Sequence, residues 1–344
     1  MTSSRSLVAL AGQPNCGKST VFNALTGASQ HVANYPGVTV DKMTGIFRQN
    51  GTSYEVVDLP GTYSLTSYSP EERVSRDFIL HDGPSVVVNV MDASNLKRSL
   101  YLTFQLAEME TPLLLDLNMM DVAENRGMRI DAKKLERRLG VPVIPTAIKR
   151  GKGKKELIRT ITGVAALPKP GRAARIDYAE MEPVIREIEA RLAAAHELCE
   201  IYPPRWLAIK LMEGDHGIEN LIRNRHPDGE GLLAFVSSER DTFEIRYEQT
   251  PEIHIAHRRY GAADDMVRSC VRPGEAGDVP LSDKMDRFVC HKIAGPAILV
   301  GMIWLLYYLS IVQGYNVTNY TWPLLAKIRS LAAVSYTHLT LPTN

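Results

Sequence analysis

One stretch restricts this chain more than any other feature: Gly12-Gln13-Pro14-Asn15-Cys16-Gly17-Lys18-Ser19. It fits the pattern G-x-x-x-x-G-K-[ST], the phosphate-binding loop, which follows a strand and opens a helix. The apolar run 7–11 predicts that strand, and residues 20–25 predict the helix. Glycines let the backbone wrap around phosphate oxygens, and the loop amides and the helix N-terminus supply positive potential. The pattern therefore predicts a nucleotide-binding α/β domain.

The loop also predicts the role of individual residues. We expect Lys18 to reach the outer phosphates and the Ser19 hydroxyl to bind magnesium. The other residues expected to line the nucleotide are Gly12, Gln13, Pro14, Asn15, Cys16, Gly17 and Thr20. The alternative for this stretch is a glycine-rich turn with a structural role only.

A second segment, residues 56–61, reads as an apolar strand that ends in a carboxylate and a turn. We expect Asp58 to lie near the magnesium and the Gly61 amide near the third phosphate, with Leu59 and Pro60 beside them. Taken alone, this sequence is an ordinary strand-to-turn transition. Its distance from the loop is the one that switch GTPases use, which favours the functional reading.

Two further segments indicate the base. Asn118-Met119-Met120-Asp121 follows an apolar run, and the Asp121 carboxylate is able to accept two N–H bonds, from N1 and N2 of guanine. Adenine offers no such pair, and leaving a buried carboxylate unpaired costs about 1–3 kcal/mol, which is the source of selectivity. Thr146 and Ala147 follow another predicted strand, and we expect the Ala147 amide to contact the guanine oxygen.

The order of predicted elements indicates four parts. Residues 5–165 alternate strand and helix patterns, with strands at 6–11, 43–48, 53–58, 85–91, 112–117 and 141–145. This predicts a mainly parallel six-stranded sheet with nucleotide at the carboxyl ends of the strands, and the turn 49–52 predicts an antiparallel hairpin. Residues 166–176 form a linker, 177–275 a helical domain with a helix beginning at Pro203-Pro204, and 276–292 a juxtamembrane segment.

The end of the chain has a different composition. No Lys, Arg, Asp or Glu occurs from Ile293 to Ala326. Residues 293–312 are mostly apolar, and about twenty apolar residues span the core of a bilayer. Lys284, Arg287 and Lys292 precede this run. Because cytoplasmic flanks carry the excess of cations, we predict a transmembrane helix at 293–312 and place residues 1–290 in the cytoplasm; a buried helix of a soluble protein is the alternative.

Charge and cysteine content exclude several classes of protein. The formal net charge is +1, so no broad surface for nucleic acid is indicated. The four cysteines form no C-x-x-C pair, which argues against a zinc site or a disulfide framework and fits a reducing compartment.

The motifs together resemble one family. Residues 32–40 (Val-Ala-Asn-Tyr-Pro-Gly-Val-Thr-Val), 58–65 (Asp-Leu-Pro-Gly-Thr-Tyr-Ser-Leu) and 117–127 resemble the first switch, the second switch and the guanine-specificity segment of bacterial ferrous iron transport protein B. The resemblance covers residues 5 to about 315. It implies a GTP-binding G domain at 5–165, a helical domain at 177–275 that stabilises bound GDP, and the first helix of a multi-pass protein of the bacterial inner membrane.

The resemblance also implies cofactors and a mechanism. Thr39 joins Ser19 and Asp58 around magnesium in the GTP state, and Gly37 and Val38 lie beside the nucleotide. A potassium ion, held by Asn15 and by carbonyls of residues 34–37, takes the place of an arginine finger. Lys18, Thr39 and Gly61 are the catalytic residues. Thr62 stands where Ras-like enzymes have a glutamine, so that intrinsic hydrolysis is expected to be slow.

Partners follow from the same resemblance: a lipid bilayer, Fe(II) through membrane helices beyond this chain, a FeoA-like small protein, further copies of the chain, and no nucleic acid. Residues 313–344 are expected to be a shortened remainder, with 334–344 non-native. The alternative function is a soluble GTPase of ribosome or RNA assembly. That reading predicts a basic RNA-binding domain after residue 165 and no membrane span.

Overall fold

A seven-stranded sheet, with the order β2-β3-β4-β1-β5-β6-β8, forms the centre of the first part of the chain. The computed structural model describes residues 6–27, 30–35, 38, 40–66, 69–167, 173–273, 285, 289–292 and 294–339. Its strands are β1 (Ser6–Gly12), β2 (Gln30–Asn34), β3 (Asp41–Gln49), β4 (Thr52–Asp58), β5 (Val86–Asp92), β6 (Leu113–Asn118), β7 (Met128–Ile130), β8 (Val143–Pro145) and β9 (Val271–Pro273). The pairs β1–β4, β1–β5, β5–β6 and β6–β8 are parallel, so the predicted α/β fold is confirmed.

The prediction of six strands was wrong. The additional strand is β2, which pairs antiparallel with β3 from Gln30 opposite Gly45 to Asn34 opposite Asp41. Strand β3 has a second edge whose N–H and C=O groups need partners, and β2 provides them. The sequence analysis did not predict β2, because residues 32–34 of this strand belong to the segment that resembles the first switch.

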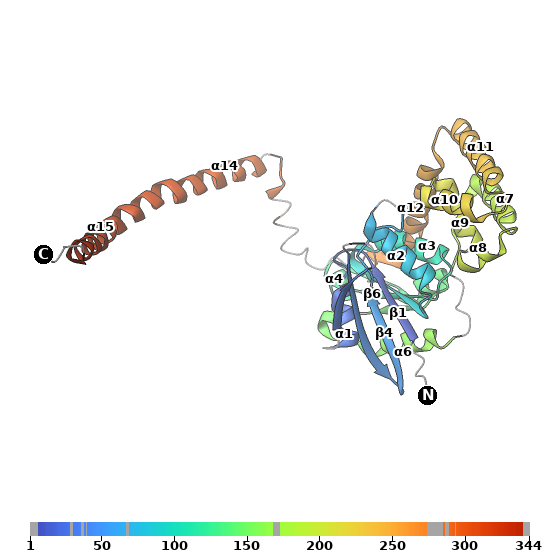
Figure 1. Ribbon diagram of the computed structural model, residues 1–344, viewed down its shortest axis with the longest axis horizontal. Coiled ribbons are helices and arrows are strands. Elements are labelled where there is room, and N and C mark those ends of the chain that lie inside the picture. Colours follow the sequence, from blue (N-terminus) through green and yellow to red (C-terminus); the bar gives the residue numbers. More distant parts are fainter. Residues whose placement is uncertain are drawn as a thin grey trace. The chain divides into compact units, whose positions relative to one another are not determined.

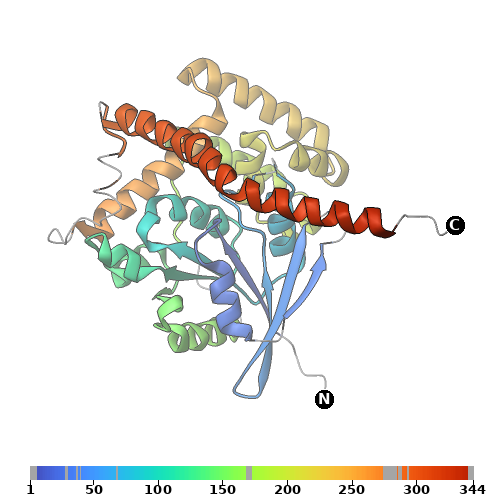
Figure 2. The same ribbon diagram turned by 90° about the vertical axis from the view of Figure 1, so that its left-hand side faces the viewer.

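The predicted hairpin between β3 and β4 is confirmed. Gln49 pairs with Thr52, and the two residues between them, Asn50 and Gly51, have φ of 51° and 78°. Positive φ at both positions is what a type I′ turn requires. Figure 2 shows this hairpin projecting past the neighbouring strands.

Helices cover both faces of the sheet (Figure 1). Alternate residues of β1 divide between two apolar clusters: Val8 and Leu10 pack with α1 and α6, whereas Ala9 and Ala11 belong to the cluster that holds α2, α3 and α5. The helices of this part are α1 (Lys18–Thr26), α2 (Pro70–His81), α3 (Leu96–Glu108), α4 (Met120–Asn125), α5 (Ala132–Leu139) and α6 (Lys154–Ala165), with 3-10 turns at Ala93–Asn95 and Ile148–Arg150.

A helical domain follows and shares the larger apolar cluster with the sheet. Its elements are a 3-10 turn at Ala179–Met181, α7 (Glu182–Leu192), α8 (His196–Ile201), α9 (Pro204–Glu213), α10 (His216–Arg225), α11 (Gly229–Tyr247) and α12 (Pro251–Cys270). Trp206, Leu207 and Ile209 of α9 are buried in the same cluster as Leu100 of α3. The two regions are therefore packed together rather than tethered.

The strand β9, directly after α12, returns to the nucleotide-binding region. It pairs antiparallel with β7, with Ile130 opposite Val271 and Arg129 opposite Arg272. Asp131 N–H also donates to Cys270 O at 2.9 Å. The end of the helical domain is thus hydrogen-bonded to the segment that follows α4.

The chain divides into two units, residues 1–277 and 278–344. The second contains α14 (Ala294–Tyr307), a π-helical turn (Tyr308–Gln313) and α15 (Gly314–Leu339). Among the described residues, one helix, Ala294–Ser330, is long and apolar enough to cross a membrane. This helix continues beyond the predicted end at residue 312, and the predicted first residue, Ile293, lies outside the described residues. The linker residues 168–172 and most of 276–292 lie outside them too, so the domain boundaries stay predictions.

Candidate nucleotide site

The phosphate-binding loop lies between β1 and α1, as predicted. Asn15 and Gly17 have φ of 65° and 90°, and Val21 N–H donates to Gly17 O at 3.0 Å, which begins the helix. A Cβ on Gly17 would lie 2.4 Å from Asn118 Nδ2, and a Cβ on Gly12 would lie 2.6 Å from Val90 O. Both glycines are required because the neighbouring strands approach the loop backbone closely.

The loop encloses an open hollow of about 460 Å³. Its lining residues are Gln13, Pro14, Asn15, Gly17, Lys18, Ser19, Thr20 and Gly61. The structure therefore brings the loop and the Gly61 segment together around one space. Cys16, by contrast, is buried beneath the loop, and burial raises the pKa of its thiol to about 11, so the thiol stays protonated at neutral pH.

Lys18 and Asp58 meet at the edge of this hollow. The Lys18 ammonium donates to Asp58 Oδ1 and to the carbonyl of Leu59, and both side chains are largely buried. Burial raises the pKa of Asp58, and the charge and hydrogen bond of Lys18 oppose that shift. The sequence assigned these residues to different ligands, phosphate and magnesium, and the structure adds that they bind each other.

The second switch begins on the loop itself. Leu59 N–H donates to Leu10 O at 3.0 Å, and Thr62 N–H donates to Gly12 O at 3.2 Å. A Cβ on Gly61 would contact the Pro14 backbone at 3.3 Å. Of the first switch, Val38 N–H donates to Tyr35 O at 3.3 Å, whereas Gly37 and Thr39 lie outside the described residues.

Oxygen donors suited to magnesium lie at this edge. Ser19 lines the hollow, and Asp58 is held beside it through Lys18. Hydroxyl and carboxylate oxygens are the ligands that Mg²⁺ prefers, usually completed by phosphates and water. The residues present therefore fit magnesium bound together with a nucleotide.

Asn118 joins the loop to the predicted base-reading segments. Its Nδ2 donates to Cys16 O at 3.1 Å, and its Oδ1 accepts from Thr146 Oγ1 at 3.2 Å and Ile148 N–H at 3.3 Å. Met119 has φ of 61°, and Met120 N–H donates to Thr146 O at 3.1 Å. One buried amide side chain thus holds three chain segments in register at the carboxyl end of β6.

Asp121 and Ala147 each have a partner in the structure. Asp121 Oδ2 lies 2.7 Å from Arg150 Nε. The Ala147 amide, expected to contact guanine, donates to Lys152 O at 3.2 Å within the turn 147–152. A guanine oxygen would have to share or replace that bond.

The sequence analysis did not predict a role for two charged residues near the segments expected to read guanine. Asp116 is fully buried; its Oδ1 accepts from Thr146 Oγ1 at 2.6 Å, and its Oδ2 has no hydrogen-bond partner among the described residues. Burial raises the pKa of Asp116 to about 7. A lone carboxylate inside the apolar run 113–117 was the available signal. Arg150 is the second, and no sequence pattern marks it.

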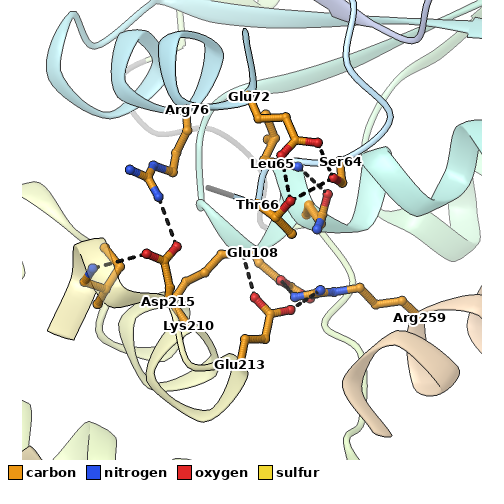
Figure 3. A network of polar contacts seen from close by, with 12 residues as sticks. Ser64, Leu65, Thr66, Glu72, Arg76, Glu108, Lys210, Glu213, Asp215 and Arg259 are labelled. Atoms are coloured by element: carbon orange, nitrogen blue, oxygen red, sulfur yellow. Dashed lines mark hydrogen bonds and ion pairs between the residues drawn. The ribbon is translucent and has the colours of Figure 1, made fainter. Parts of the chain in front are cut away.

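Helix α2 contacts both the second switch and the helical domain (Figure 3). The Glu72 carboxylate accepts from Ser64 Oγ and Thr66 Oγ1, both at 2.7 Å, and Leu65 N–H donates to Gln105 Oε1 at 2.8 Å. Farther along α2, Arg76 Nη1 donates to Asp215 Oδ2 at 3.1 Å. Helix α2 therefore orders the switch at its start and holds the helical domain at its second turn.

A buried ionic network forms the rest of this junction. Arg259 of α12 binds Glu108 of α3, with Nη2–Oε2 at 2.7 Å, and also Glu213 of α9, which accepts from Lys210 at 2.6 Å. Burial alone would raise the pKa of Glu213, but the charges of Arg259 and Lys210 and their hydrogen bonds together outweigh it and lower that pKa to about 2. Each buried charge in the network has an opposite charge beside it, the condition under which buried ions are tolerated.

Comparison with known proteins agrees with this arrangement. The family model for ferrous iron transport protein B matches residues 6–161, and the model for the FeoB cytosolic helical domain matches residues 178–272. An Fe(2+) transporter FeoB from Methanocaldococcus jannaschii is 39% identical over 300 residues, 87% of this chain and 44% of the relative. A fusion of Fe(2+) transport protein A and FeoB from Porphyromonas gingivalis is 36% identical over 317 residues, 89% of this chain and 37% of the relative. The chain thus spans less than half the length of these relatives.

Solved structures give the same result. The cytosolic domain of the T. maritima FeoB iron transporter in a GDP form has a TM-score of 0.68 and 32% identity, covering 79% of this chain and 100% of that domain. Its GMPPNP form has a TM-score of 0.66 and 33% identity, covering 78% of this chain and 99% of that domain. Because both cytosolic family models match in order, and because the phosphate-binding loop, Asn118 and the helical domain are arranged as described above, the chain belongs to the ferrous iron transport protein B family.

Proposed function

We propose that this chain is the GTP-binding and GTP-hydrolysing cytoplasmic part of a membrane transporter for Fe(II), with one membrane helix attached. The proposal depends mainly on the hydrogen bonds of Asn118, which connect the phosphate-binding loop to the two segments expected to read guanine. The GDP and GMPPNP forms of the T. maritima domain support a guanine nucleotide as the ligand. Hydrolysis of GTP regulates or drives iron uptake in this proposal.

The chain's own residues supply most of the chemistry. Lys18 exchanges Asp58 and Leu59 for the outer phosphates, and the loop amides bind the remaining phosphate oxygens. Gly61 presents its amide to the third phosphate. Ser19, Thr39 and Asp58, the last through a water, would hold magnesium, which neutralises phosphate charge when bound. The residue after Gly61 is Thr62, whose side chain has no amide to orient water as a glutamine would, so intrinsic hydrolysis is slow.

Potassium is the second proposed cation. Asn15 lines the hollow and has a φ of 65°. Its side-chain amide oxygen is the proposed first ligand of the cation. Carbonyls of the first switch around Asn34 would complete the site. A monovalent cation there contributes the charge that an arginine finger supplies in other GTPases.

Location and partners follow from the family and from the second unit. The apolar helix beginning at Ala294 enters the bacterial inner membrane as the first span of a multi-pass protein, with residues 1–290 in the cytoplasm. The fusion in Porphyromonas gingivalis favours a FeoA-like small protein as a partner. Fe(II) as the transported ion and assembly into a homo-oligomer belong to the same proposal.

The assembly-factor alternative is not supported. It requires a basic RNA-binding domain after residue 165, whereas residues 178–272 match the family's cytosolic helical domain. The chain's net charge of +1 also offers no excess of cations for an RNA backbone.

GTP hydrolysis by the full chain in detergent, in potassium and in sodium at equal ionic strength, tests the proposal. We expect faster turnover in potassium, and loss of that difference in Asn15→Ala. Asn224→Ala removes an exposed asparagine of α10 that does not line the hollow and serves as the control. Equal rates in both salts would contradict the potassium site, and an absence of GTP binding would contradict the function as a whole.

A further inference from the structure

Arg150 forms an ion pair with Asp121, the carboxylate assigned above to guanine. The distance from Arg150 Nε to Asp121 Oδ2 is 2.7 Å. The Asp121 side chain is 20% exposed and the Arg150 side chain 56% exposed. The arginine therefore lies on the solvent side of a carboxylate that is mostly enclosed.

The backbone of both residues is firmly held. Arg150 N–H donates to Ala147 O at 2.8 Å, and Ala147 and Lys152 exchange two hydrogen bonds of 3.2 Å, which closes the turn 147–152. Ile148 N–H is bound to Asn118, and Met120 N–H is bound to Thr146 O. The turn that carries Arg150 and the helix start that carries Asp121 thus have a common anchor, and only side-chain rotation is needed to form or break the pair.

We propose that Arg150 competes with guanine for the Asp121 carboxylate and thereby sets the rate at which guanine nucleotides associate. This inference rests on the proposed function, because it requires that Asp121 reads the base. Guanine N1–H and N2–H use both oxygens of one carboxylate, and the guanidinium at Oδ2 occupies one of them. The base displaces Arg150, and the exposed arginine side chain moves into water.

The size of the effect follows from the exposure of the pair. Ion pairs with one partner in solvent contribute about 0.2–1 kcal/mol, so the competition slows association by up to about five-fold. It affects association and leaves dissociation unchanged, since Arg150 does not contact the carboxylate once the base is bound. Because salt screens exposed charges, the effect decreases as ionic strength rises.

Lys149 offers a matched control. It lies beside Arg150 on the same 3-10 turn, carries the same charge and is exposed, and it is in none of the ion pairs found among the described residues. Replacing it removes the same long-range attraction for the phosphates without altering the Asp121 contact. The difference between Arg150→Gln and Lys149→Gln therefore isolates the ion pair.

The experiment is stopped-flow binding of fluorescent GDP to the full chain in detergent, at low and high salt. We expect Arg150→Gln to raise the association rate constant about two- to five-fold over Lys149→Gln at low salt, with equal dissociation rates and a smaller ratio at high salt. Arg150→Lys keeps the positive charge, and we expect its association rate constant to lie between those of the wild type and Arg150→Gln.

Two results would overturn the competition. One is equal association for the Arg150 and Lys149 variants. The other is slower association or faster dissociation in Arg150→Gln, which would mean that Arg150 holds Asp121 in place for the base. A parallel measurement with Asp121→Asn separates this failure from failure of the proposed function. If that variant binds GDP as wild type does, Asp121 does not read the base and the competition falls, whereas a wild-type chain that binds no GDP contradicts the proposed function itself.

Discussion

Arg76 Nη1 lies 3.1 Å from Asp215 Oδ2. This ion pair joins α2, the helix that follows the second switch, to the residue that immediately precedes α10. Asp215 serves two elements, since its Oδ1 also accepts from Gly217 N–H at 2.9 Å and caps α10. Both side chains are largely buried, so removal of one partner leaves a charge that water reaches poorly. The position of α2 is therefore coupled energetically to the folding of the helical domain.

A double-mutant cycle measures this coupling. Arg76→Met removes the cation, and Asp215→Asn removes the anion while keeping a side chain that caps helices well. We expect each single change to lower the free energy of unfolding by about 2–4 kcal/mol and the double change to cost less than their sum. Urea titration of the full chain provides the values, and Arg159→Met, at an exposed position of α6, is the control. Additive losses would show that the pair does not couple the two regions.

Asp121→Asn tests the base assignment. The substitution replaces a carboxylate that accepts two N–H bonds with an amide that places a donor opposite the guanine N–H groups. We expect GTP affinity to fall by about 10–200-fold and the affinity for xanthosine triphosphate to rise. Competition binding with both nucleotides is the measurement. An unchanged preference for guanine would show that another residue reads the base.

Gly17→Ala tests the close approach of β6 to the loop. The new Cβ would lie 2.4 Å from Asn118 Nδ2, at a backbone φ of 90°. We expect loss of nucleotide binding together with destabilisation of about 1–3 kcal/mol. Gly51→Ala, in the turn between β3 and β4, has a similar φ, 78°, but its Cβ would meet nothing within 4 Å. It controls for backbone strain alone, so equal effects in the two variants, read by isothermal calorimetry and thermal melting, would contradict a role for the Asn118 contact.

The stability of the chain is expected to depend on the protonation of Asp116. Burial raises the pKa of this carboxyl to about 7 in the folded state, above its ordinary value of 3.8. A raised pKa in the folded state contributes stability that is complete below the unfolded pKa and is lost as pH rises through the folded pKa. Between pH 4 and 7 the loss is at most about 1.4 kcal/mol per pH unit.

Asp116→Asn is the matched variant, since the amide oxygen still accepts from Thr146. We expect the slope of unfolding free energy against pH to decrease in this variant relative to wild type between pH 4 and 7. Denaturant titrations at several pH values give both slopes. Identical slopes would show that Asp116 ionises in the folded protein at its ordinary pKa.

Local sequence was sufficient for the phosphate-binding loop, because its glycines, its lysine and the flanking strand and helix lie within one short segment. The β3–β4 hairpin was also predictable from local sequence, because Asn50-Gly51 favours the type of turn that joins its strands. The number of strands was not predictable in this way, since β2 exists only because the edge of β3 is available to pair with it.

Tertiary structure alone decided which polar groups meet. Asp116 and Thr146 are 30 residues apart, and Arg76 and Asp215 are 139 apart. Sequence motifs predicted four site residues, Lys18, Asp58, Asn118 and Asp121. Binding a guanine nucleotide with magnesium requires those residue types at fixed positions in the motifs. Arg150, Asp116 and the ionic network around Arg259 depend instead on how the strands and helices pack, since burial and distance set the energy of a charge and neither is a property of a segment.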